Sequence, residues 1–343
     1  MTLRAAIIGY GKMGQIRHQA MLRHGGFDVV VACDTHAGFA SDIPIVTDPL
    51  KVYDYDPDVV FCCVPNHMIP GVVAEALDRG KHVFSEKPPG RNSADVRLMM
   101  AAEARNPTRV LKFGFNHRFH DAIEDAKQLI DAGTIGDLYF MRGVYGKAGG
   151  ANYAQNWRND PAKSGGGILI DQGIHMLDLF LLFADRLTDV QSVVQRKFWT
   201  DVPVEDNAFA LMRNDKGMVA SLHSSATQWQ HRFTLELYAR GGFISVNGIL
   251  SASGTYGTEV LTVALNRLDI DGNPIPNPES QEIRYTVDRS WDKEIDEFHA
   301  AVVEGAPIRC GTSQQALDVM LLVEHIYAAD AVWSQSRSAD PAP

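Results

Sequence analysis

The chain has 343 residues, of which 45% are hydrophobic, and its formal net charge at pH 7 is −10. A chain of this length is expected to form two domains that each bury a core. Its acidic balance argues against nucleic acid or an anionic membrane as a partner. No apolar run approaches the roughly 20 residues of a membrane span, and the first core strand follows Met1 without a signal peptide, so we expect a cytoplasmic protein.

The N-terminus has the order of a dinucleotide-binding fingerprint. A short apolar strand is predicted over residues 3–8, and a helix over residues 15–23. Between them lies the motif Gly9-Tyr10-Gly11-Lys12-Met13-Gly14. The first glycine permits the tight turn, the second lets the backbone approach a pyrophosphate, and the third allows close packing of helix on strand. The helix N-terminus would offer its free N–H groups to the phosphates.

A second predicted strand, over residues 28–33, ends at Asp34, which lies twenty residues beyond Gly14. An acid at this place accepts hydrogen bonds from the adenosine ribose and repels a 2′-phosphate. No arginine follows Asp34 at once, although His36 lies close by. The sequence therefore favours NAD over NADP.

Strands and helices continue to alternate along the first third of the chain. The predicted strands cover residues 59–64, 81–85 and 110–115, and the predicted helices cover residues 69–79 and 93–105. This alternation predicts a doubly wound parallel sheet, and hence a Rossmann domain over residues 1–120. Ligands of such sheets bind at the carboxyl ends of the strands. The loops expected to converge there begin at Gly9, Asp34, Pro65 and Glu86.

The pattern changes to an α+β domain over residues 121–335. A helix is predicted at 121–132, a strand at 138–144 and a glycine-led helix up to 184. The strands expected after it cover residues 190–199, 208–213, 218–226, 233–239 and 243–246, with hairpin turns at 214–217 and 240–242. They predict an open, mainly antiparallel sheet with one face against helices. Two last helices, at 291–304 and 313–333, are expected to pack near the first domain.

The glycine-led helix carries a candidate proton-transfer pair. After Gly165-Gly166-Gly167, the residues Asp171 and His175 stand at i and i+4, so that both side chains project from one helical face. A carboxylate beside an imidazole fixes its tautomer and raises its proton affinity. The glycines suggest that the backbone approaches something closely, such as a ligand. The alternative is a solvated or purely structural Asp–His pair.

Lys87 is a candidate of the first domain. It follows Glu86 at a strand end and precedes two prolines, so its backbone has little freedom, and a cis Lys87–Pro88 bond would aim it sharply. A surface lysine in a proline-rich turn is the alternative.

Taken together, Val64-Pro65-Asn66, Glu86-Lys87-Pro88 and the Asp171/His175 helix, in this order behind the fingerprint, resemble the glucose-fructose oxidoreductase/inositol dehydrogenase (Gfo/Idh/MocA) family. The resemblance covers essentially the whole chain. It implies that Lys87, Asp171 and His175 are a catalytic trio. His175 would take the proton of a hydroxyl while hydride leaves the same carbon for C4 of NAD⁺. Lys87 would stabilise charge on the reacting oxygen, and Asp171 would orient His175.

The resemblance also implies the residues around the cofactor and the partners of the chain. The expected cofactor-binding residues are Gly9, Tyr10, Gly11, Lys12, Met13, Gly14, Asp34, Val64, Pro65, Asn66, His67, Glu86 and Lys87. The C-terminal sheet would form the interface of a homodimer or homotetramer. No metal is expected, because no ligand motif is present and Cys33, Cys62, Cys63 and Cys310 lack C-x-x-C spacing, which indicates core thiols.

Residues 147–163 are the predicted specificity loop. They combine cations, amides and aromatic rings, and sugar rings are bound by stacking together with polar contacts. The substrate-binding candidates are Arg118, Lys147, Tyr153, Trp157, Arg158, Asp171 and His175. Lys147, Arg158, Lys163 and Arg118 could instead meet the phosphate of a nucleotide sugar. A solvated loop with scattered charge is the third possibility.

The sequence thus predicts an NAD-dependent dehydrogenase for a secondary alcohol of a sugar, cyclitol or nucleotide sugar. A non-catalytic sensor or scaffold that holds the dinucleotide is the alternative from another class. A reductase of a C=C or C=N bond, as in biliverdin or a dihydrodiol-type substrate, is the alternative among enzymes.

Overall fold

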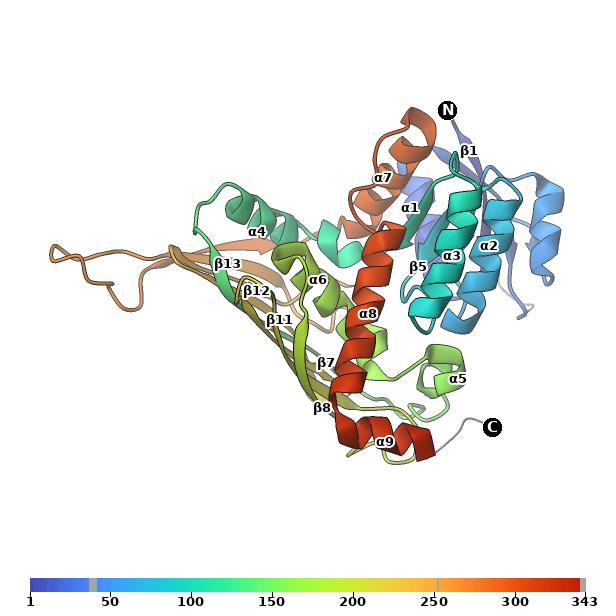
Figure 1. Ribbon diagram of the computed structural model, residues 1–343. Coiled ribbons are helices and arrows are strands. Elements are labelled where there is room, and N and C mark those ends of the chain that lie inside the picture. Colours follow the sequence, from blue (N-terminus) through green and yellow to red (C-terminus); the bar gives the residue numbers. More distant parts are fainter. Residues whose placement is uncertain (37–41, 252, 340–343) are drawn as a thin grey trace. The chain divides into compact units, whose positions relative to one another are not determined.

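The computed structural model of the chain describes residues 1–36, 42–251 and 253–339, with the backbone alone for 336–339. The chain divides into two compact units that are each discontinuous in sequence. Unit 1 comprises residues 1–116, 162–165 and 290–321, and unit 2 comprises residues 117–161, 166–289 and those from 322 onward. Figure 1 shows the elements of both units coloured along the sequence.

Unit 1 contains a parallel sheet of six strands in the order β3-β2-β1-β4-β5-β6. The strands are β1 (Leu3–Ile8), β2 (Phe27–Cys33), β3 (Ile45–Val46), β4 (Val59–Cys62), β5 (His82–Glu86) and β6 (Leu111–Gly114). Beside β1 the order reverses, which is the topological switch point of a doubly wound fold. The predicted Rossmann-type sheet is thereby confirmed, with the two-residue β3 as a strand that the sequence did not predict.

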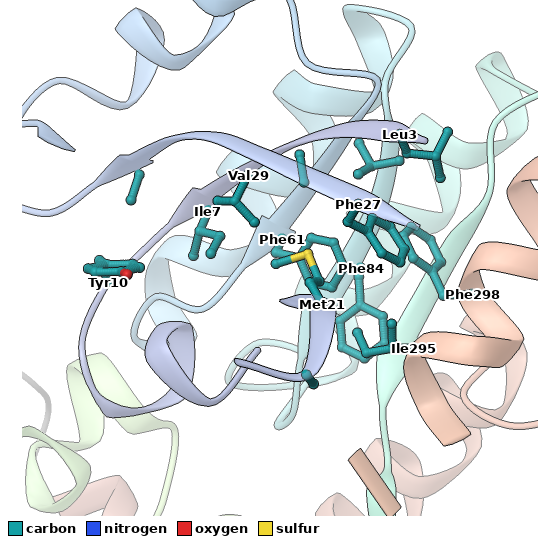
Figure 2. Packing of buried hydrophobic residues seen from close by; sticks show 14 residues of the cluster. Leu3, Ile7, Tyr10, Met21, Phe27, Val29, Phe61, Phe84, Ile295 and Phe298 are labelled. Atoms are coloured by element: carbon teal, nitrogen blue, oxygen red, sulfur yellow. The ribbon is translucent and has the colours of Figure 1, made fainter. Parts of the chain in front are cut away.

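Helices cover both faces of this sheet. They are α1 (Lys12–His24), α2 (Ile69–Asp78), α3 (Ser93–Arg105) and α7 (Ser290–Glu304), with a 3₁₀ segment at Pro49–Tyr55. Helix α2 packs beside α3, and α1 packs beside α7 (Figure 1). Figure 2 shows how α7 contributes Ile295 and Phe298 to the core of strands β1, β2, β4 and β5. The Phe298 ring meets Phe61 and Phe84 edge-on, with centroids 5.6 Å apart in both pairs.

A buried ion-pair cluster joins three elements of unit 1. Arg17 of α1 is fully buried, and its guanidinium lies 2.5 Å from Glu86 of β5 and 2.7 Å from Glu294 of α7. The aromatic rings of Phe84 and Trp291 cover the same guanidinium at 4.3 and 4.7 Å. Burial raises the pKa of Glu294, and the charge of Arg17 opposes that shift. A buried charge needs such partners, so the cluster holds α7 against the N-terminal strands.

Unit 2 contains a sheet of eight strands in the order β14-β13-β12-β11-β7-β10-β9-β8. The strands are β7 (Leu138–Ala148), β8 (Asp189–Gln195), β9 (Asn207–Arg213), β10 (Val219–Ser225), β11 (Thr227–Ala239), β12 (Gly242–Asn247), β13 (Glu259–Leu265) and β14 (Ser280–Tyr285). Among the described strands of this sheet, only β7 and β10 pair in parallel. The predicted open, mainly antiparallel sheet and both hairpins are confirmed.

One face of this sheet is covered, and the other presents apolar side chains to the surface. Helices α4 (Asp121–Asp131) and α6 (Ile174–Ala184) lie on the same face (Figure 1). On the opposite face Val193 and Phe209 are register partners on β8 and β9, and they are 58% and 38% exposed. Leu211 of β9 is 53% exposed. Val193, Phe209 and Leu211 are therefore exposed apolar side chains on one face of neighbouring strands.

Several element predictions need correction. Strands β13 and β14 were not predicted; β14 is exposed along its length and has no alternation of apolar residues for a pattern to detect. The strand predicted to reach residue 199 ends at Gln195, and β11 begins six residues before its predicted start. The single helix predicted over 313–333 is two, α8 (Ser313–Ala329) and α9 (Ala331–Ala339), because the Asp330 carboxylate accepts N–H groups from Trp333 and Val194.

The segment Pro161–Ala184 is, among the described residues, the one helical stretch long and apolar enough to span a membrane by length and composition. The prediction that no apolar run approaches the length of a membrane span is therefore wrong for Pro161–Ala184. However, 72% of its most apolar window is buried in the protein, as in the core helix of a globular fold.

The fingerprint glycines give the first testable prediction. A Cβ at Gly14 would lie 2.1 Å from the Gly9 carbonyl oxygen, whereas a Cβ at Gly11 would have no heavy atom within 4 Å. We expect Gly14→Ala to lower the free energy of unfolding by about 1–3 kcal/mol through overpacking. Gly11→Ala, the matched control, should stay within about 0.5 kcal/mol of the wild type. Urea denaturation measures both values, and equal losses in the two variants would contradict the packing role of Gly14.

Candidate functional site

The glycine loop after β1 is shaped by the neighbouring backbone. Gly9 has a φ of 94°, and a Cβ there would lie 2.5 Å from the Cys63 carbonyl oxygen. Gly11 precedes the first turn of α1, and no side chain caps that helix end. The open space at Gly11 and the uncapped N–H groups of α1 leave room and hydrogen-bond donors for a pyrophosphate. Lys12 and Met13 stand in this first turn. The loop therefore fits a dinucleotide.

Asp34 lies directly after β2 and faces the glycine loop. Its carboxylate accepts the Tyr10 N–H at 2.9 Å and the His36 N–H at 2.9 Å, and its side chain is 13% exposed. Each carboxylate oxygen keeps a further lone pair, which can accept a hydroxyl hydrogen of a ribose. The Tyr10 side chain points into the protein, where its hydroxyl lies 2.6 Å from His18 Nδ1. Tyr10 therefore offers its backbone rather than its ring to the loop.

The loops after β4 and β5 hold the other candidates of unit 1. Val64, Pro65, Asn66 and His67 follow β4, and the buried Asn66 amide donates to the Ser164 carbonyl oxygen at 2.8 Å. Lys87 follows β5, is half-buried and forms a cis peptide bond with Pro88. Glu86 lies in the ion-pair cluster with Arg17. That contact gives Glu86 a structural role, and its contact with the cofactor stays a prediction.

In unit 2 the segment with Asp171 and His175 departs from the predicted regular helix. Residues Leu169–Gly173 form a π-helical turn that continues into α6, so Asp171 lies in the wider turn and His175 in the α-helix. Such π turns occur frequently at functional sites. Gly173 allows this turn to approach β10, because a Cβ there would lie 2.9 Å from Ser224 Oγ.

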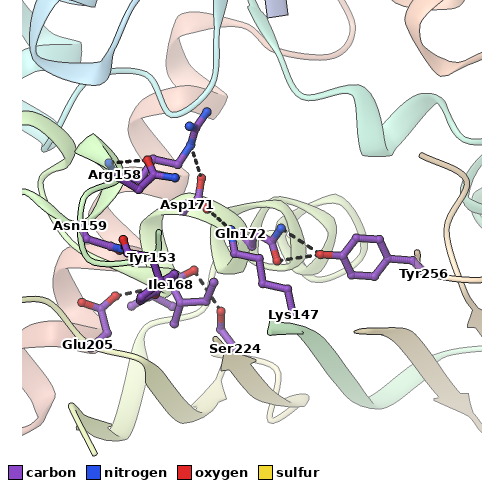
Figure 3. Close-up of polar contacts among 12 residues, drawn as sticks. Lys147, Tyr153, Arg158, Asn159, Ile168, Asp171, Gln172, Glu205, Ser224 and Tyr256 are labelled. Atoms are coloured by element: carbon purple, nitrogen blue, oxygen red, sulfur yellow. Dashed lines mark hydrogen bonds and ion pairs between the residues drawn. The ribbon is translucent and has the colours of Figure 1, made fainter. Parts of the chain in front are cut away.

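Glu205 holds the start of the segment. Its side chain is labelled in Figure 3. The buried carboxylate accepts the N–H groups of Gly167 and Leu169 at 2.8 and 2.9 Å and the Tyr327 hydroxyl at 2.7 Å. Burial raises the pKa of Glu205 against the effect of these hydrogen bonds. The sequence did not single out Glu205, because it lies in a loop between strands and no local pattern marks it.

The three leading glycines approach protein atoms rather than an open ligand space. A Cβ at Gly165 would lie 2.3 Å from the Arg91 carbonyl oxygen, one at Gly166 would lie 2.2 Å from the Tyr327 hydroxyl, and one at Gly167 would lie 2.2 Å from the Glu205 carbonyl oxygen. The expected close approach is present, but its partner is the chain itself.

Asp171 joins the two basic residues of the specificity loop. Its carboxylate lies 2.6 Å from Lys147 Nζ and 3.2 Å from Arg158 Nε (Figure 3). These residues line a cavity of about 310 Å³ in unit 2. Its polar and aromatic lining includes Lys147, Asn152, Tyr153, Asn156, Arg158 and Asp171. Trp157 is not in this lining, and the Arg158 guanidinium lies over its ring at 4.6 Å. The structure thus brings four of the predicted substrate residues to one cavity.

His175 is 4% exposed and stacks on a second imidazole. The ring centroids of His175 and His117 are 3.7 Å apart, and the rings are 20° from parallel. His117 Nε2 lies 3.1 Å from the Tyr145 hydroxyl, and the Tyr145 ring meets Tyr256 edge-on at 5.3 Å. Tyr256 in turn shares hydrogen bonds with the Gln172 side chain at 3.0 and 3.1 Å (Figure 3). Tyr145, Tyr256 and Gln172 were not expected near the site.

Arg118 forms a buried ion pair with Asp178 of α6. Its guanidinium lies 2.7 and 2.6 Å from the two carboxylate oxygens of Asp178 on α6, and both side chains are buried. A bidentate ion pair of this kind orients α6. Arg118 therefore has a structural role that is an alternative to the predicted contact with substrate.

A metal centre is not apparent in residues 1–36, 42–251 and 253–339, where no group of three or more His, Cys, Asp or Glu side chains is placed to hold an ion.

Both the N-terminal and the C-terminal parts of the chain match known families of sequences. Residues 3–114 match an oxidoreductase family with an NAD-binding Rossmann fold, and residues 123–245 match the GFO/IDH/MocA C-terminal domain. A D-glucoside 3-dehydrogenase of Escherichia coli is 31% identical over 185 residues, which are 51% of this chain and 52% of that protein. An inositol 2-dehydrogenase of Gluconacetobacter diazotrophicus is 27% identical over 239 residues, 64% and 66% of the two chains.

The fold agrees with that of solved structures. A levoglucosan dehydrogenase in complex with NADH superposes with a TM-score of 0.85 at 20% identity, over 97% of this chain and 98% of the other. Together the two sequence matches account for more than half of the residues. The chain therefore belongs to the GFO/IDH/MocA family of oxidoreductases, with an NAD-binding Rossmann fold in its N-terminal part.

Proposed function

We propose that the chain is an NAD-dependent dehydrogenase that moves a hydride between the nicotinamide and a secondary alcohol or ketone of a sugar or cyclitol. The observation that carries the proposal is the arrangement in unit 2. The carboxylate of Asp171 lines a polar cavity, and the buried His175, which is not among the residues of that lining, lies four residues further along the same helical segment. An imidazole of this kind is the usual general base for an alcohol, and the polar lining suits hydroxyl groups.

In the oxidation direction, His175 removes the proton of the substrate hydroxyl as the carbonyl forms, and in reduction it returns that proton. NAD⁺, when bound, supplies the acceptor for the hydride that leaves the same carbon. Lys87 of unit 1 is the proposed hydrogen-bond donor to the reacting oxygen, where its charge stabilises developing negative charge. Asp171 is proposed to orient His175, and through Lys147 and Arg158 it also fixes two side chains of the cavity.

The polar groups of the cavity suit the hydroxyl groups of a polyol. Both cations of the lining, Lys147 and Arg158, lie against the Asp171 carboxylate, and Arg118 is paired with Asp178. The other polar side chains of the lining are Asn152, Tyr153, Asn156 and Asn159, whose amides and hydroxyl can donate and accept hydrogen bonds as sugar hydroxyls do. The relatives named D-glucoside 3-dehydrogenase and inositol 2-dehydrogenase support the same substrate class.

The exposed apolar face of the unit 2 sheet supports a homo-oligomer. Val193, Phe209 and Leu211 would be covered by a second copy, which would remove apolar area from water. The excess of acidic residues supports a protein that binds neither nucleic acid nor anionic membranes, and the cytoplasm is its proposed location.

The test of the proposed function is NADH formation at 340 nm from NAD⁺ with a panel of cyclitols, free sugars, glycosides and nucleotide sugars. With a substrate from the panel, His175→Ala is expected to lower kcat by about 10²–10⁴-fold, because the base is lost. NAD binding, measured by calorimetry, should be unchanged. His325→Ala, an exposed histidine on α8, is the matched control. Turnover by His175→Ala at the wild-type rate would contradict the mechanism.

Cofactor choice gives a third prediction. Asp34→Ala removes the carboxylate that we propose accepts hydrogen bonds from the ribose, so NAD should bind more weakly and NADP should be discriminated against less. The ratio of kcat/KM for NAD⁺ and NADP⁺ measures the change. Asp28→Ala, an exposed residue of β2, serves as control. An unchanged ratio in Asp34→Ala would contradict the proposal that Asp34 binds the ribose of the cofactor.

A further inference from the structure

The imidazoles of His175 and His117 form one buried stack. Their centroids lie 3.7 Å apart at 20°, and the side chains come from different elements, since His175 lies on α6 and His117 precedes α4. His117 is 7% exposed and His175 is 4% exposed. Nearly parallel rings at this distance leave little freedom for either ring to turn, so each restrains the orientation of the other.

The groups that face this stack are aromatic or already paired. Phe233 of β11 lies 5.9 Å from His117, and Tyr145 of β7 lies within hydrogen-bond distance of it. His120 meets His117 edge-on at 5.5 Å. The remaining charged groups around it form pairs: His120 with Glu259, Arg118 with Asp178, and Lys147 and Arg158 with Asp171. The stack therefore has little contact with solvent.

From this geometry we propose that His117 is a positioning residue for His175, and that the two stacked rings bind protons one at a time. The proposal rests on the proposed role of His175 as the acid–base group. His117 holds the ring of His175 in its reactive orientation, and it remains neutral while His175 carries the substrate proton.

Electrostatics supports the order of protonation. Two positive charges at stacking distance in a buried site repel strongly, because little water screens them. The second proton is therefore bound at a lower pH than the first, and the pair titrates in two separate steps. His175 therefore binds a proton from the substrate most readily when His117 is neutral, because no second positive charge then repels it.

Tyr145 supports the neutral state of His117. Burial raises the pKa of Tyr145 well above its ordinary value, so its phenol keeps its proton at neutral pH. The hydroxyl can then donate to Nε2 of a neutral His117 ring. This contact would fix the tautomer of His117 while the stack fixes its plane.

The test is an NMR titration of the protein with isotope-labelled histidine. In the wild type the signals of His117 and His175 should each show two inflections, separated by more than about one pH unit. In His117→Phe, which keeps a flat ring but no charge, His175 should show one inflection. His117→Gln repeats the measurement if the phenylalanine variant does not fold. The matched control is His223→Phe, because His223 stacks on Phe209 at 4.1 Å elsewhere in unit 2.

Kinetic measurements test whether His117 orients the ring of His175, separately from the coupled protonation of the two rings. His117→Ala should lower kcat by about 10²-fold with KM nearly unchanged, because His175 loses its stacked partner, and His117→Phe should restore most of that loss. A single inflection for wild-type His175 that does not move in His117→Phe would overturn the proposal. An intact two-step titration, together with full activity of His175→Ala, would instead overturn the proposed function and leave the coupling of the rings in place.

Discussion

The buried carboxylate of Glu205 is the contact on which the arrangement of the candidate site depends. It binds two backbone N–H groups at the start of the segment that carries Asp171 and His175, and also the hydroxyl of Tyr327 on α8. Each of these donors is inside the protein, and a buried donor left without an acceptor costs about 1–3 kcal/mol. The carboxylate therefore fixes where the π-helical turn begins, and that start sets the positions of the acid and the imidazole that follow.

Unit 1 also contains buried carboxylates that are held by polar partners. The guanidinium of Arg17 lies between Glu86 and Glu294 and is covered by two aromatic rings. Burial of these charges is tolerated because each has a partner of opposite sign. Glu86 is followed by Lys87, so the same cluster anchors the strand end from which the proposed oxygen-binding lysine emerges. In both units a buried carboxylate is thus joined through the backbone to a proposed catalytic residue.

Much of the fold was predictable because it depends on local patterns. Strand β1 and helix α3 have the predicted bounds, and the glycine motif with Asp34 predicts the cofactor loop from local sequence alone. Contacts between residues far apart in the chain were not predictable. The pairing of Arg17 with Glu294, the capping of Gly167 by Glu205 and the stack of His117 on His175 each join segments that carry no shared local signal. The π-helical turn was missed because its apolar spacing is close to that of an α-helix.

The predicted site residues fall into two groups once their partners are known. Lys147, Tyr153, Arg158 and Asp171 line one cavity, which is the proposed polyol site. Arg118 and Glu86 are occupied by ion pairs that stabilise the fold. His117, for which we propose a positioning role, stacks on the proposed base His175.

The measurement that tests the central claim most directly is isotope transfer. The enzyme would be incubated with NAD⁺ and a polyol substrate deuterated at the carbon that is oxidised, and the NADH would be analysed by mass spectrometry. Direct hydride transfer from that carbon predicts NADH that is one mass unit heavier. Unlabelled NADH from the same substrate would contradict oxidation at the C–H bond next to the hydroxyl that His175 deprotonates.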